Sequence, residues 1–260
     1  ASGTVSMTGQ HNTGATYALS LSGSTSITAG TGVTLESLNN NTGTIALLSS
    51  GGINGGSGTV LMRAAMYAFG GADRTITTTG VLTIQPDADE NSFASSFDNQ
   101  YLNPVNVTGL TLGKSSNASA ITLSRAISLS GPVSIYGGSI DVNANITANS
   151  GNILLDADTG STLNQSSTGI LLDDAITIET VTSGNLTLIG RSGDTGSGFD
   201  GIDASSANTT TLRSAGNLTL QGYSYAASGS GRGVDLNNDV IAASGTVSMT
   251  GQHNTGATYA

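Results

Sequence analysis

Closely spaced carboxylates are the groups in this chain whose type and spacing could support catalysis. Three sets stand out: Asp173 with Asp174, Asp200 with Asp203, and Asp87 with Asp89 and Glu90. Glycoside hydrolysis needs two carboxyl groups about 5 to 10 Å apart in space, which spacing along the chain does not fix. Aspartates beside strands more commonly accept hydrogen bonds from turn amides and keep a surface soluble. We therefore expect that this protein is not an enzyme. The alternative is that it is a carbohydrate-binding or polysaccharide-cleaving protein.

Metal and cofactor sites are not expected either. Asp156-Ala-Asp158-Thr-Gly160 has the first spacing of an acidic calcium loop but lacks its terminal acidic ligand. Gly196-Ser-Gly198-Phe-Asp200 resembles a glycine-rich calcium repeat without the tandem nonapeptides. The chain has two histidines, His11 and His253, and no cysteine, so no cysteine is available to complete a histidine–cysteine metal site or catalytic set. We predict no catalytic residue, no cofactor and no metal.

Aromatic and arginine side chains form the most plausible contact surface. One group lies in loops of variable length, where binding usually resides on a constant scaffold. It comprises Arg191, Phe199, Tyr223, Tyr225 and Arg232. The second region, residues 85–104, holds Phe93, Phe97, Tyr101 and two of the three prolines. It is predicted to be a loop excursion that caps the sheet or contacts a neighbouring fibre.

The elements that must position these side chains recur with a short period. Strand-like segments begin at Gly151, Gly184, Gly216 and Gly245. A second marker recurs at Gly169-Ile170, Gly201-Ile202 and Gly233-Val234, and a third strand-like segment completes each repeat at Ile176, Leu212 and Ile241. Each strand has inward apolar residues at period 2, and a single turn cannot bury them. The pattern predicts an all-β, right-handed parallel β-helix (β-solenoid), with about 30 residues and three short strands per turn.

The repeat also predicts which core residues stack on one another. The first strand of each turn gives two ladders and the second strand gives a third. They are Ile153, Leu186, Leu218 and Val247; Leu155, Leu188, Leu220 and Met249; and Ile170, Ile202 and Val234. An antiparallel sandwich would need hairpin turns between neighbouring strands and would not keep this period.

A much longer repeat encloses the short one. Residues 1–18 return letter for letter as residues 243–260, so the chain is one 242-residue unit plus the opening of the next. At about 30 residues per turn, a unit would hold about eight turns and advance about 40 Å. The register of the glycine markers carries across the copied segment. We therefore predict one continuous solenoid over residues 1–260, of the kind found in fibres and extended binding arrays.

Two stretches carry a family resemblance. Gly109-Leu-Thr-Leu-Gly113 and Gly131-Pro-Val-Ser-Ile-Tyr-Gly-Gly-Ser-Ile-Asp-Val-Asn-Ala-Asn-Ile146 resemble the β-strand-repeat exoproteins related to filamentous haemagglutinins. The resemblance implies a very large, secreted or surface-displayed bacterial adhesin or filament protein with a β-helical shaft. Residues 64–104 depart from the pattern.

Composition limits the partners. The net charge is −10 with seven basic residues, which argues against binding nucleic acid or anionic membranes. No apolar stretch approaches the roughly 20 residues that a membrane helix needs, so we expect no membrane insertion of this segment. The expected function is a structural shaft outside the cell, with cell-surface or matrix components, or neighbouring copies of the same fibre, as partners.

Overall fold

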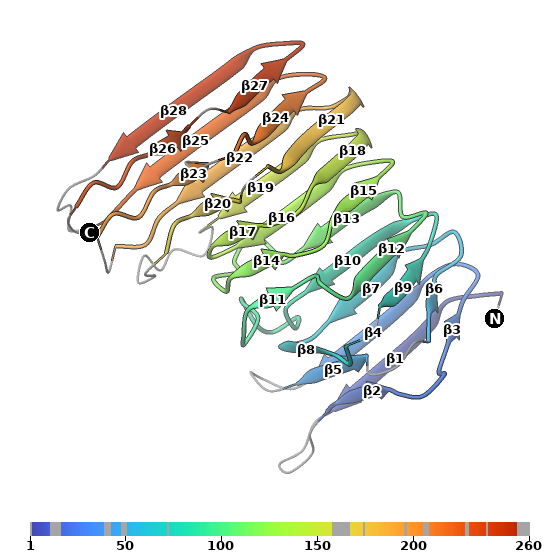
Figure 1. Ribbon diagram of the computed structural model, residues 1–260. Helices are drawn as coiled ribbons and strands as arrows, with labels where there is room; N and C mark the ends of the chain where they lie inside the picture. The colour runs from blue at the N-terminus through green and yellow to red at the C-terminus, as the bar shows by residue number, and fades with distance from the viewer. Residues whose placement is uncertain are drawn as a thin grey trace.

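The strands stack into an elongated parallel β-solenoid with the two ends of the chain at opposite ends of the stack (Figure 1). The computed structural model describes residues 2–10, 17–38, 43–47, 51–71, 73–157, 167–173, 175–194, 197–204, 208–226, 229–237 and 239–253. All regular elements in these ranges are strands. None of the described segments forms a helix long and apolar enough to cross a membrane. The predicted all-β, parallel β-helical fold is confirmed.

The first face is a single parallel sheet that runs the whole length of the solenoid. Its ten strands follow one another in chain order. They are β1 (Val5–Gln10), β4 (Val33–Leu38), β7 (Val60–Arg63), β10 (Val81–Gln85), β13 (Gly109–Leu112), β16 (Val133–Gly137), β19 (Ile153–Ala157), β22 (Leu186–Arg191), β25 (Leu218–Ser224) and β28 (Val247–His253).

The second face is divided into two parallel sheets with a break between β8 and β11. The first sheet holds β2 (Leu19–Leu21), β5 (Thr44–Leu47) and β8 (Met66–Phe69). The second holds β11 (Phe97–Asp98), β14 (Ile121–Leu123), β17 (Ile140–Val142), β20 (Ile170–Leu172), β23 (Ile202–Ala204) and β26 (Val234–Leu236).

The third face breaks one turn later, between β12 and β15. Its first sheet holds β3 (Ile27–Thr28), β6 (Ile53–Asn54), β9 (Arg74–Thr77) and β12 (Leu102–Val105). Its second holds β15 (Ile127–Leu129), β18 (Ile146–Ser150), β21 (Thr177–Ser183), β24 (Thr211–Ser214) and β27 (Val240–Ala243). Each turn therefore gives one strand to each face, which confirms the three strands predicted per turn.

The turns are shorter and less regular than the sequence pattern suggested. Val5 and Val247 hold equivalent positions in the first and last strands of the ten-stranded sheet, so nine turns separate them instead of about eight. The turn from Val133 to Ile153 is much shorter than the next turn, from Ile153 to Leu186. The three turns between Ile153 and Val247, which supplied the predicted period, are longer than all the others.

The core is a set of apolar ladders along the axis. Leu186 pairs with Ile153 on one side and Leu218 on the other, and Leu218 pairs in turn with Val247. The other two predicted ladders, which run through Leu188 and Ile202, are also formed by the residues that the sequence predicted. Most of these side chains are completely buried, because inward positions alternate with outward ones along each strand. All three predicted ladders are confirmed.

The Gly-Asn pairs that precede the strands of the first face have a defined structural role. Gly151 and Gly184 have φ values of 122° and 113°, which L side chains rarely adopt. The asparagine that follows each glycine accepts a hydrogen bond from the backbone of the next turn: Asn152 Oδ1 from Asn185 N and Asn185 Oδ1 from Asn217 N, both at 2.8 Å. The motif therefore ties successive turns together at the corner of the solenoid.

Residues 85–104 are only partly an excursion. They include β11 and most of β12, which pair with β14 and β9 as parts of the solenoid. The irregular segment is confined to residues 86–96. The pairing was not evident because β11 is only two residues long and Pro104 lies within β12.

Candidate binding site

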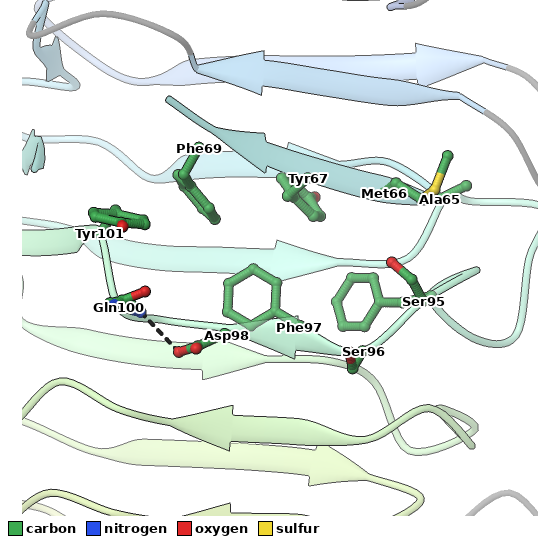
Figure 2. Close-up of a pocket in the computed structure, with 11 residues that line it drawn as sticks. Ala65, Met66, Tyr67, Phe69, Ser95, Ser96, Phe97, Asp98, Gln100 and Tyr101 are labelled. Carbon is green, nitrogen blue, oxygen red and sulfur yellow. Dashed lines mark hydrogen bonds between the residues drawn. The ribbon is translucent and has the colours of Figure 1, made fainter. Parts of the chain in front are cut away.

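A cavity of about 190 Å³ lies at the break between β8 and β11 (Figure 2). The walls are the side chains of these two strands and of the residues just before and after β11. Ala94 N still donates to Ala65 O at 2.8 Å, so the two turns are joined at one end of the break. Beyond that point β8 pairs only with β5, and β11 pairs only with β14, among the described strands.

Four aromatic rings pack together in the wall of the cavity. Tyr67 and Phe69 pair with the buried Ile45 and Leu47, and Phe97 pairs with the buried Ile121, so all three rings point toward the core. The Tyr67 and Phe97 ring centroids are 5.7 Å apart at 86°, and those of Phe69 and Phe97 are 6.2 Å apart at 79°. Phe93 stacks on Phe97 at 5.6 Å.

The rings occupy the space between the two unpaired strands. Stacked β-strands lie about 4.8 Å apart where they pair. At the break, the edge-to-face rings of Tyr67 and Phe97 make contact across strands that do not pair with each other.

The Tyr67 hydroxyl has a fixed role inside the wall. It donates a hydrogen bond to Gln85 O at 2.9 Å. Burial raises the pKa of Tyr67 well above its ordinary value, so the phenol remains protonated. The ring is therefore held in place as a neutral donor and does not titrate near neutral pH.

Polar groups line the mouth of the cavity. Asp98 is the only charged residue among those that line it. Its Oδ1 accepts a hydrogen bond from Gln100 N at 2.9 Å, and its Oδ2 accepts one from Ser124 Oγ at 3.1 Å. Ser95 and Ser96 lie on the same rim. The site thus combines an aromatic interior with one negative charge at its entrance.

The structure brings the second predicted group of contact residues together at this cavity. Phe93 and Phe97 are buried at 4% exposure each, and Tyr101 is half-buried in the lining. Sequence reasoning missed Tyr67, Phe69, Asp98 and Gln100. The alternation of Tyr67 and Phe69 in a chain of mostly aliphatic strands was the available signal.

The first predicted group lies elsewhere, around β22 to β26. Arg191 and Tyr223 are register neighbours, with the guanidinium 5.6 Å from the ring centroid, and Arg191 Nη1 also lies 3.2 Å from Asp156 Oδ1. Tyr225 N donates to Ser192 Oγ, and Phe199 O accepts from Ser224 Oγ. The exposed Arg232 forms an ion pair with Asp235. Apart from the ion pair of Arg232, these contacts join neighbouring turns, four to five turns along the solenoid from the cavity.

One predicted carboxylate pair does come together. Oxygens of Asp200, Asp203 and Asp235 all lie within 4.8 Å of one another. Burial raises the pKa of Asp200, and the charges of Asp203 and Asp235 add to the rise. The Arg232 backbone N–H, which bonds Asp200, and the Arg232 charge oppose it. The cluster is therefore a group of three neighbouring carboxylates, of which Asp235 is ion-paired with Arg232.

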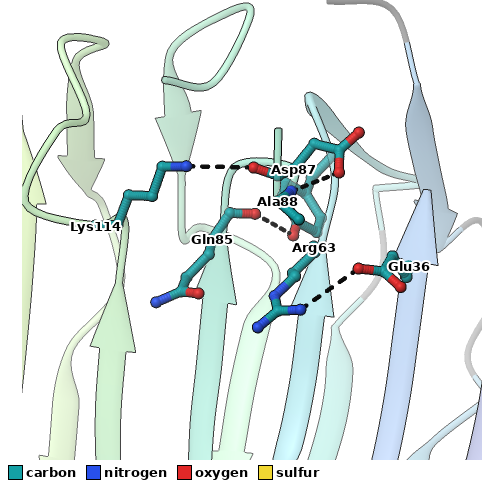
Figure 3. A network of polar contacts seen from close by, with 7 residues as sticks. Glu36, Arg63, Gln85, Asp87, Ala88 and Lys114 are labelled. Atoms are coloured by element: carbon teal, nitrogen blue, oxygen red, sulfur yellow. Dashed lines mark hydrogen bonds and ion pairs between the residues drawn. The ribbon is translucent and has the colours of Figure 1, made fainter. Parts of the chain in front are cut away.

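Of the other predicted carboxylates, Asp87 serves a turn and Asp174 falls outside the described ranges. Asp87 is buried, and its Oδ1 accepts a hydrogen bond from Ala88 N at 2.5 Å. Lys114 Nζ donates a hydrogen bond to the Asp87 carbonyl oxygen at 3.3 Å, near the ion pair of Arg63 and Glu36 (Figure 3). His11, Asp174, Gly196 and residues 158–160 lie outside the residues that the structure describes.

Comparison of the chain with family models, curated proteins and solved structures finds no match. The functional interpretation therefore depends on the geometry described above.

Proposed function

We propose that this chain is a segment of a rigid β-solenoid shaft in a repetitive extracellular adhesin or surface filament, and that its function is mechanical extension. One observation carries the proposal: the sequence of β1 recurs in β28, and the two strands lie at opposite ends of one uninterrupted ten-stranded sheet. The proposed shaft is non-enzymatic, with cell-surface or matrix components, or neighbouring fibres, as its partners.

Both halves of a junction between units are present in this chain. β28 pairs with β25, which places Val247 on Leu218 and Met249 on Leu220. β1 pairs with β4, which places Val5 on Val33 and Met7 on Leu35. Because β28 is a copy of β1, the β4 copy of a following unit can pair with β28 in the same register in which β4 pairs with β1. Each strand pairing that the junction needs is therefore already found in this chain.

The same stacking would join the interrupted faces across the junction. The three-stranded sheet that begins with β2 would continue the six-stranded sheet that ends with β26. The four-stranded sheet that begins with β3 would continue the five-stranded sheet that ends with β27. On both faces, nine strands would then lie between successive breaks, and each unit would add nine turns to the shaft.

Electron microscopy of chains with one, two and three 242-residue units tests the proposal. Nine strand spacings of about 4.8 Å predict that each unit adds about 43 Å to a thin rod of constant width. A matched control replaces the second unit with a flexible Gly/Ser segment of equal length, which should not extend the rod. Compact particles, or units that bend freely at each junction, would contradict the proposal.

A further inference from the structure

We propose that the cavity between β8 and β11 binds a small organic cation that carries a quaternary ammonium group. The aromatic rings would enclose the cationic group, and Asp98 at the mouth would balance its charge. This activity goes beyond the shaft function and does not depend on it, since all the residues involved belong to two successive turns of one unit.

The arrangement of the rings is the first argument. A cation is attracted to the face of an aromatic ring, and the attraction grows when the site is removed from water. The ring planes of Tyr67 and Phe97 are nearly perpendicular at 86°, as are those of Phe69 and Phe97 at 79°. Rings in such an arrangement surround a compact group from more than one direction. A sugar would instead be expected to use an open, flat aromatic surface.

The size of the cavity is the second argument. An apolar cavity of about 150 Å³ in a protein interior admits a benzene-sized ligand. The present cavity, at about 190 Å³, therefore admits a trimethylammonium group with a short chain attached. Larger ligands would have to leave their remaining parts outside the mouth.

Charge is the third argument. Asp98 is the only charged residue among the described ones that line the cavity, and its two oxygens are held by Gln100 N and Ser124 Oγ. Arg125, next to Ser124, does not neutralise it, because its guanidinium bonds Asp73 at 2.6 Å. The whole chain carries a net charge of −10. A ligand with a positive charge complements this site, whereas an anionic ligand would be repelled.

Calorimetric titration of the one-unit chain tests the proposal with two probes of the same shape. Choline carries the quaternary ammonium group, and 3,3-dimethyl-1-butanol replaces it with a neutral tert-butyl group. We expect saturable choline binding at least tenfold tighter than binding of the alcohol. Choline should also raise the melting temperature, because a ligand that binds only the folded state stabilises it.

Matched variants locate the binding. Asp98→Asn should weaken choline binding several-fold and leave binding of the alcohol unchanged. Asp203→Asn is the control, because Asp203 occupies the same position on β23, four strands along the same sheet. It removes one charge from the chain without touching the cavity and should leave choline binding intact. Phe69→Leu should bring the affinities for choline and the alcohol closer together, with the circular dichroism spectrum showing that the variant is folded.

Three outcomes would overturn the proposal. These are equal affinity for choline and the neutral alcohol, no saturable choline binding by the folded chain, or saturable binding of methyl glucoside without choline binding. The last outcome would assign the cavity to carbohydrates. Failure of the rod-length experiment would leave this test unaffected, because it uses a single unit.

Discussion

At the scale of single residues, asparagine and aspartate connect one turn to the next. Asn217 Oδ1 accepts a hydrogen bond from Thr246 N at 2.9 Å, and Asp239 Oδ1 accepts one from Thr210 N at 3.0 Å. These bonds satisfy amides at the strand ends, where the ladder stops. They explain why a chain with few charges places its carboxylates beside strands.

Asp200 is the aspartate whose removal should stabilise the fold. Burial, with Asp203 and Asp235 nearby, raises its pKa above that of the unfolded chain. Its ionised form is therefore disfavoured in the folded state, and the stability that the protonated form provides is lost as pH rises through the raised pKa. Asp200→Asn keeps an oxygen that can accept from Arg232 N and removes the charge. We expect the variant to have a higher free energy of unfolding at pH 7.

Urea unfolding of both proteins at pH 7 and near pH 4 measures this effect. The difference in stability between variant and parent should shrink at the lower pH, where a larger fraction of Asp200 is protonated in the parent because its pKa is raised. A variant that is less stable than the parent at pH 7 would show that the Asp200 charge is satisfied by Arg232.

At the scale of the strand, the corner between the first and second faces depends on facing glycines. Gly190 and Gly222 lie near the ends of β22 and β25, and Gly201 and Gly233 come immediately before β23 and β26. A Cβ on Gly222 would lie 1.7 Å from Gly233 O, and one on Gly190 would lie 2.0 Å from Gly201 O. The backbones approach so closely that only glycine fits.

Gly222→Ala should therefore destabilise the solenoid. Overpacking of a closely packed site typically costs about 1 to 3 kcal/mol, and here the obstacle is backbone that cannot rotate away. Gly3→Ala is the matched control, because a Cβ there meets nothing within 4 Å. Chemical denaturation of the two variants compares them directly, and equal stabilities would contradict the close contact at the corner.

The sequence predicted the C-terminal strands better than the N-terminal ones for a definite reason. Between Gly151 and Gly245 the turns keep similar lengths and repeat the same markers, so the core ladders could be aligned. Earlier turns vary in length, as the short turn between Val133 and Ile153 shows, and the count of turns was one too low. The aromatic site was only half predicted, because Tyr67 and Phe97 come together where two successive turns stack without pairing of their strands, which spacing alone does not reveal.

At the scale of the whole molecule, the solenoid is nearly one-dimensional. Each strand of the first face pairs only with the strands directly before and after it in the stack, as far as the structure describes the chain. The stability of such a protein is approximately a sum over turns and the interfaces between them. A defect in one turn should therefore open the shaft locally and leave distant turns folded.

Leu186→Asp tests this expectation. Leu186 is fully buried between Ile153 and Leu218, so the variant would place an unpaired charge in the core at a cost of several kcal/mol. Limited proteolysis should cut the variant near β22 and release two protease-resistant parts. Thr187→Asp, which puts the same charge on an outward-facing neighbour, should resist cutting as the parent does. Uniform digestion of the whole variant chain would argue for a single cooperative unit.

The recurrence of β1 in β28 has a consequence for inheritance. Recombination between the copied stretches would add or remove one whole 242-residue unit, because residues 1–18 and 243–260 match letter for letter. The exchange point falls within a strand that already has a correct partner on each side, β25 before it and β4 after it. Alleles that differ in the number of units would all encode solenoids in register. If the protein is the shaft that we propose, its length could then change in a single generation without passing through a misfolded intermediate.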